Sequence, residues 1–298
     1  MFVLGATAMA QSNEDARKCA EIDNNPDLAI EHCTKAISSG QLAERPLSVT
    51  HFNRGNAFLQ KGDFDKAIVD YDAAIKLDPQ YAPAYRNRGG AWFAKGEADR
   101  SLADLDAAIA RDPRSAPSFY NRARLLLLKG EFSRAVTDLD AALRLSPEFL
   151  PSFGTRGRAR FYREQYADAV LDLMRYWEGQ KDPFIILWVH LAKARMGQDA
   201  SRELDQVAGL LKATEWPMPV VDMYRGRADA QAVLAAAKAD PRYQRSRTCE
   251  AQFYIAEQLL IQGRKSEAEP LLKAAIDGCP RGFVEYEGAL AELSKLRK

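Results

Sequence analysis

The chain has 298 residues, and its 42 basic and 41 acidic side chains leave a formal charge of +1. This balance argues against a binder of nucleic acid or of an anionic membrane, because such partners favour an excess of positive charge. Apolar residues make up 47% of the chain, which is ordinary for a folded protein. No run approaches the roughly 18 apolar residues that span a bilayer. We therefore expect a folded protein with no nucleic-acid partner and no membrane span.

The first ten residues, MFVLGATAMA, are apolar and end in a small-x-small pattern before Gln11. This pattern is typical of the cleavage site of a secretory signal, although the basic segment that usually precedes it is missing. A disordered end is the alternative interpretation. No lipobox precedes Cys19, which argues against a lipid anchor there. We expect residues 1–10 to be a signal-peptide remnant or a disordered end, and the protein to be periplasmic or secreted.

The four cysteines fall on the arms of two predicted helix hairpins. Cys249 opens the first helix of one hairpin and Cys279 closes the second, while Cys19 and Cys33 sit on the two arms of an N-terminal hairpin. The start of one antiparallel helix lies beside the end of its partner, so we expect the disulfides Cys249–Cys279 and Cys19–Cys33 and an oxidising compartment. The alternative is four reduced, buried cysteines that act as small hydrophobes.

A pattern of 34 residues recurs four times, beginning near Ser48, Ala82, Ala116 and Leu150. Each copy has a small residue at its eighth and twentieth positions, where two helices would cross closely. This period is typical of the tetratricopeptide repeat (TPR), which is a helix, a tight turn and a second helix. The sequence predicts an all-α fold, a right-handed TPR superhelix of stacked antiparallel helix hairpins with a C-terminal capping helix.

The regularity of the repeat changes along the chain and divides it into five segments. Terminal units should be atypical, because they must seal an apolar end of the stack. We expect a remnant or disordered end at 1–10, an N-terminal capping hairpin at 11–46, four regular TPR units at 47–183, degenerate helical units at 184–245, and a C-terminal TPR unit plus capping helix at 246–298.

Every regular repeat has arginine at position seven and aspartate at position 23. Because the two positions lie on facing helices, a guanidinium can meet a carboxylate with two parallel hydrogen bonds. We interpret these pairs as architecture rather than as a recognition track. The arginines are Arg54, Arg88, Arg122 and Arg156, and the aspartates, which they can meet within or between repeats, are Asp70, Asp104, Asp138 and Asp172.

The first helices carry the candidate binding residues, because in TPR proteins these helices line the ligand-binding surface. Asparagine at position six of three repeats can hydrogen-bond a peptide backbone without selecting its sequence. Nearby arginines and tyrosines would make a polar, mildly basic trough that suits an extended or acidic segment. The alternative is that asparagine at this position partly satisfies neighbouring backbone groups within the repeat. The candidates are Asn53, Asn56, Arg86, Asn87, Tyr120, Asn121, Arg124, Arg158 and Tyr162.

The sequence carries no catalytic signature, phosphate-binding loop or metal-ligand spacing, so we expect no enzyme activity, cofactor or metal. His32 stands between Glu31 and Cys33, and consecutive side chains on a helix point in different directions and cannot share a metal. The carboxylate clamp of heat-shock co-chaperones is also incomplete, since Phe52 and Pro117 stand where cations belong. Capture of a chaperone C-terminus is therefore disfavoured.

The C-terminal third, with EAQFYIAEQLLIQG and FVEYEGALAEL, resembles the NlpI-type periplasmic TPR adaptors. Those adaptors dimerise, bind peptidoglycan hydrolases and present them to a processing protease. The resemblance implies a non-enzymatic envelope scaffold that holds client peptides or proteins, such as cell-wall enzymes, and it leaves a homodimer open. One alternative is a self-assembling structural subunit that uses exposed aromatics at Trp177, Phe184 and Trp188. Another is a cytoplasmic chaperone-associated TPR protein.

Overall fold

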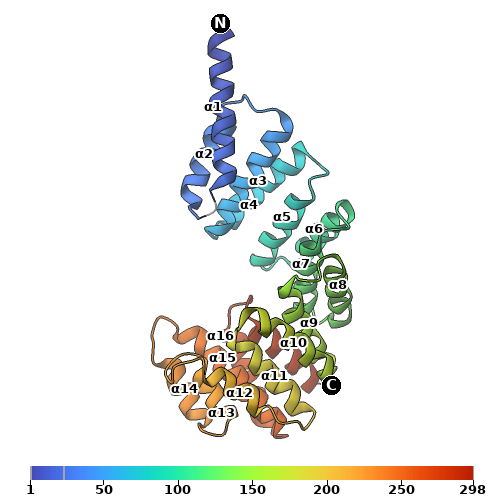
Figure 1. Cartoon of the computed structure of the whole chain (residues 1–298), viewed down its shortest axis with the longest axis vertical. Coiled ribbons are helices and arrows are strands. Elements are labelled where there is room, and N and C mark those ends of the chain that lie inside the picture. The colour runs from blue at the N-terminus through green and yellow to red at the C-terminus, as the bar shows by residue number, and fades with distance from the viewer. Residues whose placement is uncertain (1, 23, 298) are drawn as a thin grey trace. The chain divides into compact units, whose positions relative to one another are not determined.

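The computed structural model describes residues 2–22 and 24–297, with residues 2–8 described by their backbone alone. Met1, Asp23 and Lys298 lie outside the described residues. Within the described part, the chain forms 17 helices and no strand (Figure 1). It divides into two compact units, unit 1 at 1–125 and unit 2 at 126–298. The expected all-α TPR fold is confirmed.

Unit 1 is a stack of helix hairpins in which α1 packs on α2, α3 on α4, and α5 on α6. The helix α1 begins at Phe2, before the first residue of the capping hairpin expected at 11–46. The unit contains α1 (Phe2–Glu21), α2 (Pro26–Ser38), α3 (Glu44–Gln60), α4 (Phe64–Leu77), α5 (Ala82–Ala94), α6 (Ala98–Arg111) and the first part of α7 (Ala116–Leu128).

Small residues let the two helices of a repeat approach closely. A Cβ atom on Gly55 of α3 would lie 2.7 Å from the Tyr71 ring of α4, and one on Gly89 of α5 would lie 3.1 Å from Leu105 of α6. Tyr71 and Leu105 are fully buried at these crossings. Gly96 follows α5 with a φ of +81°, a conformation that glycine adopts without steric cost and that ends the helix.

The four position-seven arginines, Arg54, Arg88, Arg122 and Arg156, which we call the ladder arginines, each bind a residue of the preceding hairpin, and for Arg54 this is Thr34. Arg54 and Arg156 both bind the position-23 aspartate of their own repeat through Nε and Nη2, at 2.6–2.8 Å. The Nη1 atom of Arg156 reaches back to Asp140 of the preceding hairpin at 2.6 Å, and Arg122 reaches Asp106 in the same way at 2.7 Å. The arginines therefore fix the stacking of hairpins, as the architectural interpretation expects.

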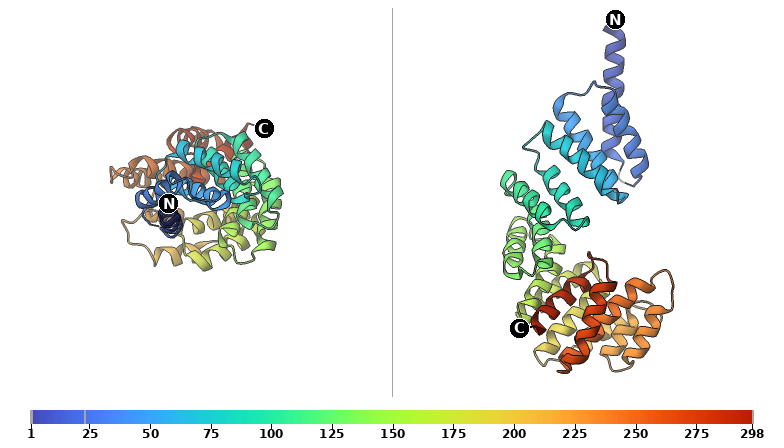
Figure 2. Two further views of the ribbon diagram at one scale, coloured as in Figure 1. Left: turned by 90° about the horizontal axis from the view of Figure 1, so that it is seen from above. Right: turned by 180° about the vertical axis from the view of Figure 1, so that it is seen from behind.

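Unit 2 continues the hairpins and ends in a helix that lies against α15 and α16, as the view from behind shows (Figure 2). After the end of α7 it contains α8 (Phe132–Leu145), α9 (Leu150–Tyr162), α10 (Tyr166–Gln180), α11 (Pro183–Arg195), α12 (Ser201–Ala208), α13 (Met218–Tyr224), α14 (Ala230–Lys238), α15 (Gln244–Ile261), α16 (Lys265–Gly278) and α17 (Val284–Leu296).

Two disulfides join the arms of hairpins at opposite ends of the sequence. Cys19 of α1 is bonded to Cys33 of α2, and Cys249 of α15 is bonded to Cys279 at the end of α16. Their Cα atoms are 5.0 Å and 5.2 Å apart, within the ordinary range for a disulfide. No cysteine of the described chain is free. The structure therefore contains both pairings that the hairpin argument predicts.

The aromatic residues that suggested a self-assembly surface are not on the surface. Trp177 is 4% exposed and Trp188 is 1% exposed. Trp188 packs against Phe161 and Phe253, with ring centroids 5.4 Å and 5.5 Å apart, and Phe184 is partly buried, with its ring centroid 6.5 Å from that of Tyr254. The interpretation of Trp177 and Trp188 as exposed aromatics is therefore wrong, because both are buried in the core of unit 2, and Phe184 is partly buried.

Candidate functional site

The polar residues that could suggest chemistry have structural partners. His32 hydrogen-bonds Asp15 and His51 hydrogen-bonds Asp70, both at 2.8 Å. Burial lowers the pKa of His190 to about 4, so this imidazole stays neutral where it stacks on Tyr224. Among the described residues, no group of three or more His, Cys, Asp and Glu side chains could hold a metal ion. None of the helices searched is long and apolar enough to cross a membrane.

Seven of the nine candidate binding residues lie on the three first helices of unit 1. The 34-residue period places equivalent positions of α3, α5 and α7 on the same side, and all seven side chains are partly exposed. We call this set the first-helix face. It consists of Asn53 and Asn56 of α3, Arg86 and Asn87 of α5, and Tyr120, Asn121 and Arg124 of α7.

Hydrogen bonds hold part of the first-helix face in place. Asn56 Oδ1 accepts bonds from the Tyr71 hydroxyl at 2.8 Å and from Asn87 Nδ2 at 2.7 Å. Arg86 Nε donates to Asn87 Oδ1 at 3.2 Å. Burial raises the pKa of Tyr71, which keeps its hydroxyl protonated as a donor. Asn56 and Asn87 therefore bond to each other across two successive repeats, and not to backbone within one repeat as the alternative expected, while Asn87 retains one amide hydrogen for another partner.

The two arginines of the first-helix face differ from the ladder arginines in their surroundings. Among the described residues, neither Arg86 nor Arg124 has a carboxylate within ion-pair distance, whereas Arg88 and Arg122 both do. The Arg124 guanidinium instead lies 5.5 Å from the centre of the Phe93 ring. Burial lowers the pKa of Arg86, although a guanidinium stays charged at neutral pH. The face thus presents two cations without a carboxylate partner.

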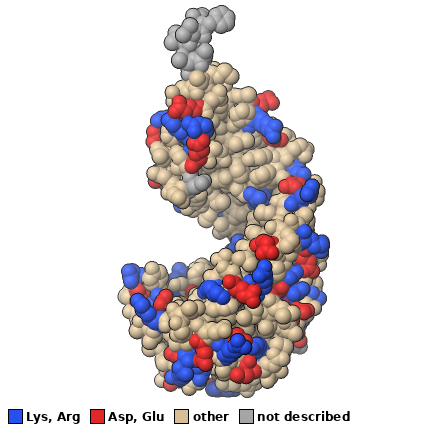
Figure 3. Space-filling model, in the orientation of Figure 1, with Lys and Arg blue, Asp and Glu red and all other residues tan. Residues whose placement is uncertain are grey.

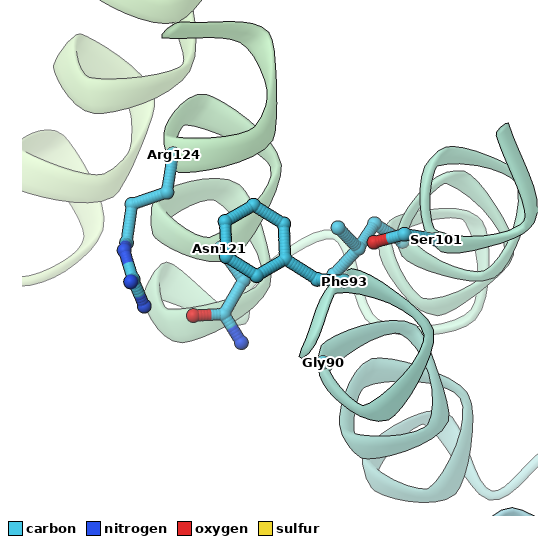
Figure 4. Close-up of a pocket in the computed structure, with 6 residues that line it drawn as sticks. Gly90, Phe93, Ser101, Asn121 and Arg124 are labelled. Atoms are coloured by element: carbon cyan, nitrogen blue, oxygen red, sulfur yellow. The ribbon is translucent and has the colours of Figure 1, made fainter. Parts of the chain in front are cut away.

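A small pocket opens on the first-helix face beside Arg124 (Figure 4). Its volume is about 80 Å³. It exists because position nine of this repeat is Gly90, where the neighbouring repeats carry Asn56 and Arg124, and a Cβ on Gly90 would meet no atom within 4 Å. The lining residues are Gly90 and Phe93 of α5, Ser101 and Leu105 of α6, and Asn121 and Arg124 of α7.

The pocket combines an apolar wall with polar groups that can bind a ligand. In Figure 4, Asn121 and Arg124 project from α7 on the side of the Phe93 ring, and the Ser101 hydroxyl points from α6 toward Phe93. Ser101 is 0% exposed, and its Oγ has no hydrogen-bond partner. Such a buried hydroxyl costs about 1–3 kcal/mol if it stays unsatisfied. The pocket therefore offers an amide, a guanidinium and an unsatisfied hydroxyl.

The remaining two candidates, Arg158 and Tyr162, are covered in unit 2. Tyr162 is 3% exposed, and its hydroxyl would lie 3.0 Å from a Cβ on Gly288 of α17. Arg158 Nε lies 3.9 Å from Glu287 Oε1, also on α17. The expectation that Arg158 and Tyr162 contact a partner is therefore corrected, because the chain's own last helix occupies their side.

Sequence reasoning also missed a cluster of buried glutamates in unit 2. Arg195 of α11 lies between two of them, 2.8 Å from Glu257 of α15 and 3.6 Å from Glu292 of α17. Burial and the nearby Glu292 raise the pKa of Glu257 to about 7. Glu285 of α17 accepts a hydrogen bond from Tyr254 at 2.8 Å. The available signal was the set of acidic residues within the largely apolar sequences of α15 and α17.

Acidic and basic side chains are mixed on the face of the molecule shown in Figure 3. On the face shown in Figure 3, acidic and basic side chains alternate over each unit, with no broad region of one sign. This agrees with the formal charge of +1.

Comparisons with known proteins define the class of fold. TPR repeat and tetratricopeptide repeat family models match residues 55–96 and 93–148. The chain therefore contains TPR repeats over these residues, and the part of the chain that the structure describes has an all-α fold of TPR type.

Three solved structures of low sequence identity share this fold. A tetratricopeptide repeat protein of Parabacteroides merdae is 15% identical, with a TM-score of 0.60 over 91% of this chain and 99% of that one. The pilF protein of Pseudomonas aeruginosa is 17% identical, with a TM-score of 0.51 over 84% and 99%. A MamA fragment of Desulfovibrio magneticus is 17% identical, with a TM-score of 0.50 over 58% and 96%.

Proposed function

We propose that this protein is a non-enzymatic scaffold that holds segments of other proteins on the first-helix face of unit 1. The observation that carries the proposal is the alignment of seven partly exposed polar and aromatic side chains on three consecutive first helices. Their amides and guanidinium groups suit an extended backbone, which offers donors and acceptors at regular spacing. The TPR repeats at 55–148 support the same interpretation.

We further propose that the scaffold is a periplasmic adaptor. Two disulfides that close hairpins favour an oxidising compartment, since cytosolic thiols are kept reduced. The resemblance of the C-terminal third to NlpI-type adaptors supplies the proposed clients, which are peptidoglycan hydrolases or a protease, and the proposed homodimer. Counting free thiols on protein from its native host tests the compartment: none is expected, and four would indicate the cytoplasm. Sedimentation at several concentrations tests the dimer.

A crosslinked pull-down from native envelope extract tests the binding face. The wild type is compared with an Asn53→Ala/Asn121→Ala variant, which spares the Asn56–Asn87 hydrogen bond. The matched control is Asn13→Ala/Gln80→Ala, which removes two exposed amides of unit 1 away from the face. We expect the wild type and the control to recover the same clients and the face variant to lose them. Equal recovery by all three proteins would contradict the proposed face.

A further inference from the structure

We infer that the pocket at Gly90 binds the carboxylate side chain of an aspartate or glutamate in a client segment, through Arg124 and Asn121. The inference rests on the proposed scaffold function and names the chemistry that its face selects. Three observations carry it: the position of Arg124 in the repeat, the groups in the pocket, and the behaviour of the equivalent arginine in unit 2.

Arg124 and Arg158 occupy the same position, the ninth, of successive repeats. In unit 2, Arg158 lies 3.9 Å from Glu287, and the two side chains are only 12% and 9% exposed. The glutamate belongs to α17, which packs on α15 and α16 and whose Gly288 lies close to the hydroxyl of Tyr162 on α9, the first helix of this repeat. In unit 2 a position-nine arginine thus lies within ion-pair distance of a carboxylate on the helix that covers it, although Nε and Oε1 are too far apart for a hydrogen bond.

The helix α17 also places a second carboxylate close to an arginine of α11. Glu292 of α17 lies 3.6 Å from Arg195 of α11 and is 4% exposed at its side chain. The helix α17 therefore places a carboxylate within ion-pair distance of both arginines, although the hydrogen-bonded partner of Arg195 is Glu257 of α15, at 2.8 Å. In unit 1, Arg124 stands at the same repeat position as Arg158. Among the described residues, it has no carboxylate within ion-pair distance.

The pocket is suited to the carboxylate in its shape and its charge. No acidic residue is among those that line the pocket. The planar guanidinium of Arg124 lies beside the Phe93 ring, and its N–H donors can still face outward. Hydrogen bonds from a guanidinium to a carboxylate are among the stronger ones in proteins. An apolar side chain would instead leave both Arg124 and the buried Ser101 hydroxyl without a partner. The open space at Gly90 admits the side chain that carries the acid.

The test is selection from a random peptide library, acetylated and amidated at its ends so that only side chains supply carboxylates. Full-length wild type is compared with Arg124→Gln, which removes the cation, and Gly90→Leu, which fills the pocket. Leucine forms helix better than glycine, so the second variant should fold, and thermal melting verifies this. The control is Arg114→Gln, which removes an exposed arginine from the turn after α6. Sequencing of the retained peptides gives the enrichment of Asp and Glu.

We expect the wild type and Arg114→Gln to enrich peptides with acidic residues. In both pocket variants this enrichment should be about tenfold lower, as the loss of a charged hydrogen bond implies. Wild-type retention of peptides without an acidic preference would overturn the inference and leave the scaffold function standing. Retention of no peptide would contradict both. If Arg124→Gln changes the sedimentation of the protein and not its peptide selection, the occupant is a second copy of the chain, and the inference fails.

Discussion

Arg88 of α5 holds Asp104 of α6 with two parallel hydrogen bonds, Nε to Oδ2 at 2.8 Å and Nη2 to Oδ1 at 2.6 Å. Its remaining nitrogen, Nη1, binds Asp72 of the preceding hairpin. Asp104 is 7% exposed, so its carboxylate depends on the arginine for compensation of its charge. One planar guanidinium thereby fixes the crossing of α5 on α6 and the stacking of this repeat on the previous one.

Replacing Arg88 should destabilise unit 1 strongly. Arg88→Ala leaves the Asp104 carboxylate buried without its cation, and we expect the free energy of unfolding to fall by about 3–5 kcal/mol. Arg88→Lys keeps the charge but cannot form the parallel pair of bonds, so its loss should be intermediate. Asp72→Asn, at the more exposed end of the network, should cost about 0–1 kcal/mol. Urea denaturation measures all three, and equal effects of Arg88→Ala and Asp72→Asn would contradict this account.

Reduction should weaken unit 2 through the Cys249–Cys279 bond. This disulfide spans 30 residues, and in the chain-entropy model closing such a loop contributes about 3–4 kcal/mol. We expect the Cys249→Ser/Cys279→Ser variant to lose about that much in the free energy of unfolding. Adding a reductant should lower the melting temperature of unit 2 in the wild type. The variant should be insensitive to reductant there, and an equal shift in both proteins would show that the effect comes from elsewhere.

The repeats were predictable because their signals are local and recur. Each crossing needs a small residue such as Gly55 and a large one such as Tyr71, and the spacing of these residues is visible in one repeat and checked by the next. The positions of the first-helix face follow from the same period. The coverage of Arg158 was not predictable, because it depends on where α17 docks, about 130 residues further along the chain. An amphipathic pattern shows that a helix is covered, and it does not show by which segment.

The stability of unit 2 should fall as the pH rises past neutrality. Burial and the nearby Glu285 raise the pKa of Glu250 to about 7 from its ordinary value of 4.5. The folded state therefore binds this proton more tightly than the unfolded state. Its stabilising effect is complete below about pH 4.5 and is lost as the pH rises through about 7. We expect the melting temperature of unit 2 to be higher at pH 5.5 than at pH 8.

Glu250→Gln should reduce this dependence on pH, because the amide does not titrate. Some dependence should remain, since Glu257 also has a pKa raised to about 7, by burial and the nearby Glu292. Glu250 accepts a hydrogen bond from the Trp216 indole, so indole fluorescence provides a second readout near the same pH. Glu178→Gln, at an exposed position, is the control and should leave the dependence unchanged. A wild type that melts at the same temperature at both pH values would contradict the assignment.

The docking of α17 should depend on the absence of a side chain at Gly288. A Cβ there would lie 2.6 Å from the Phe253 ring and 3.0 Å from the Tyr162 hydroxyl, so Gly288→Val should push α17 away from α9 and α15. Overpacking of this kind costs about 1–3 kcal/mol. We expect faster amide hydrogen exchange over 284–296 and a lower melting temperature of unit 2. Ser294→Val introduces the same side chain at an exposed position of α17 and should change neither. If both variants exchange like the wild type, α17 does not need the close contact at Gly288.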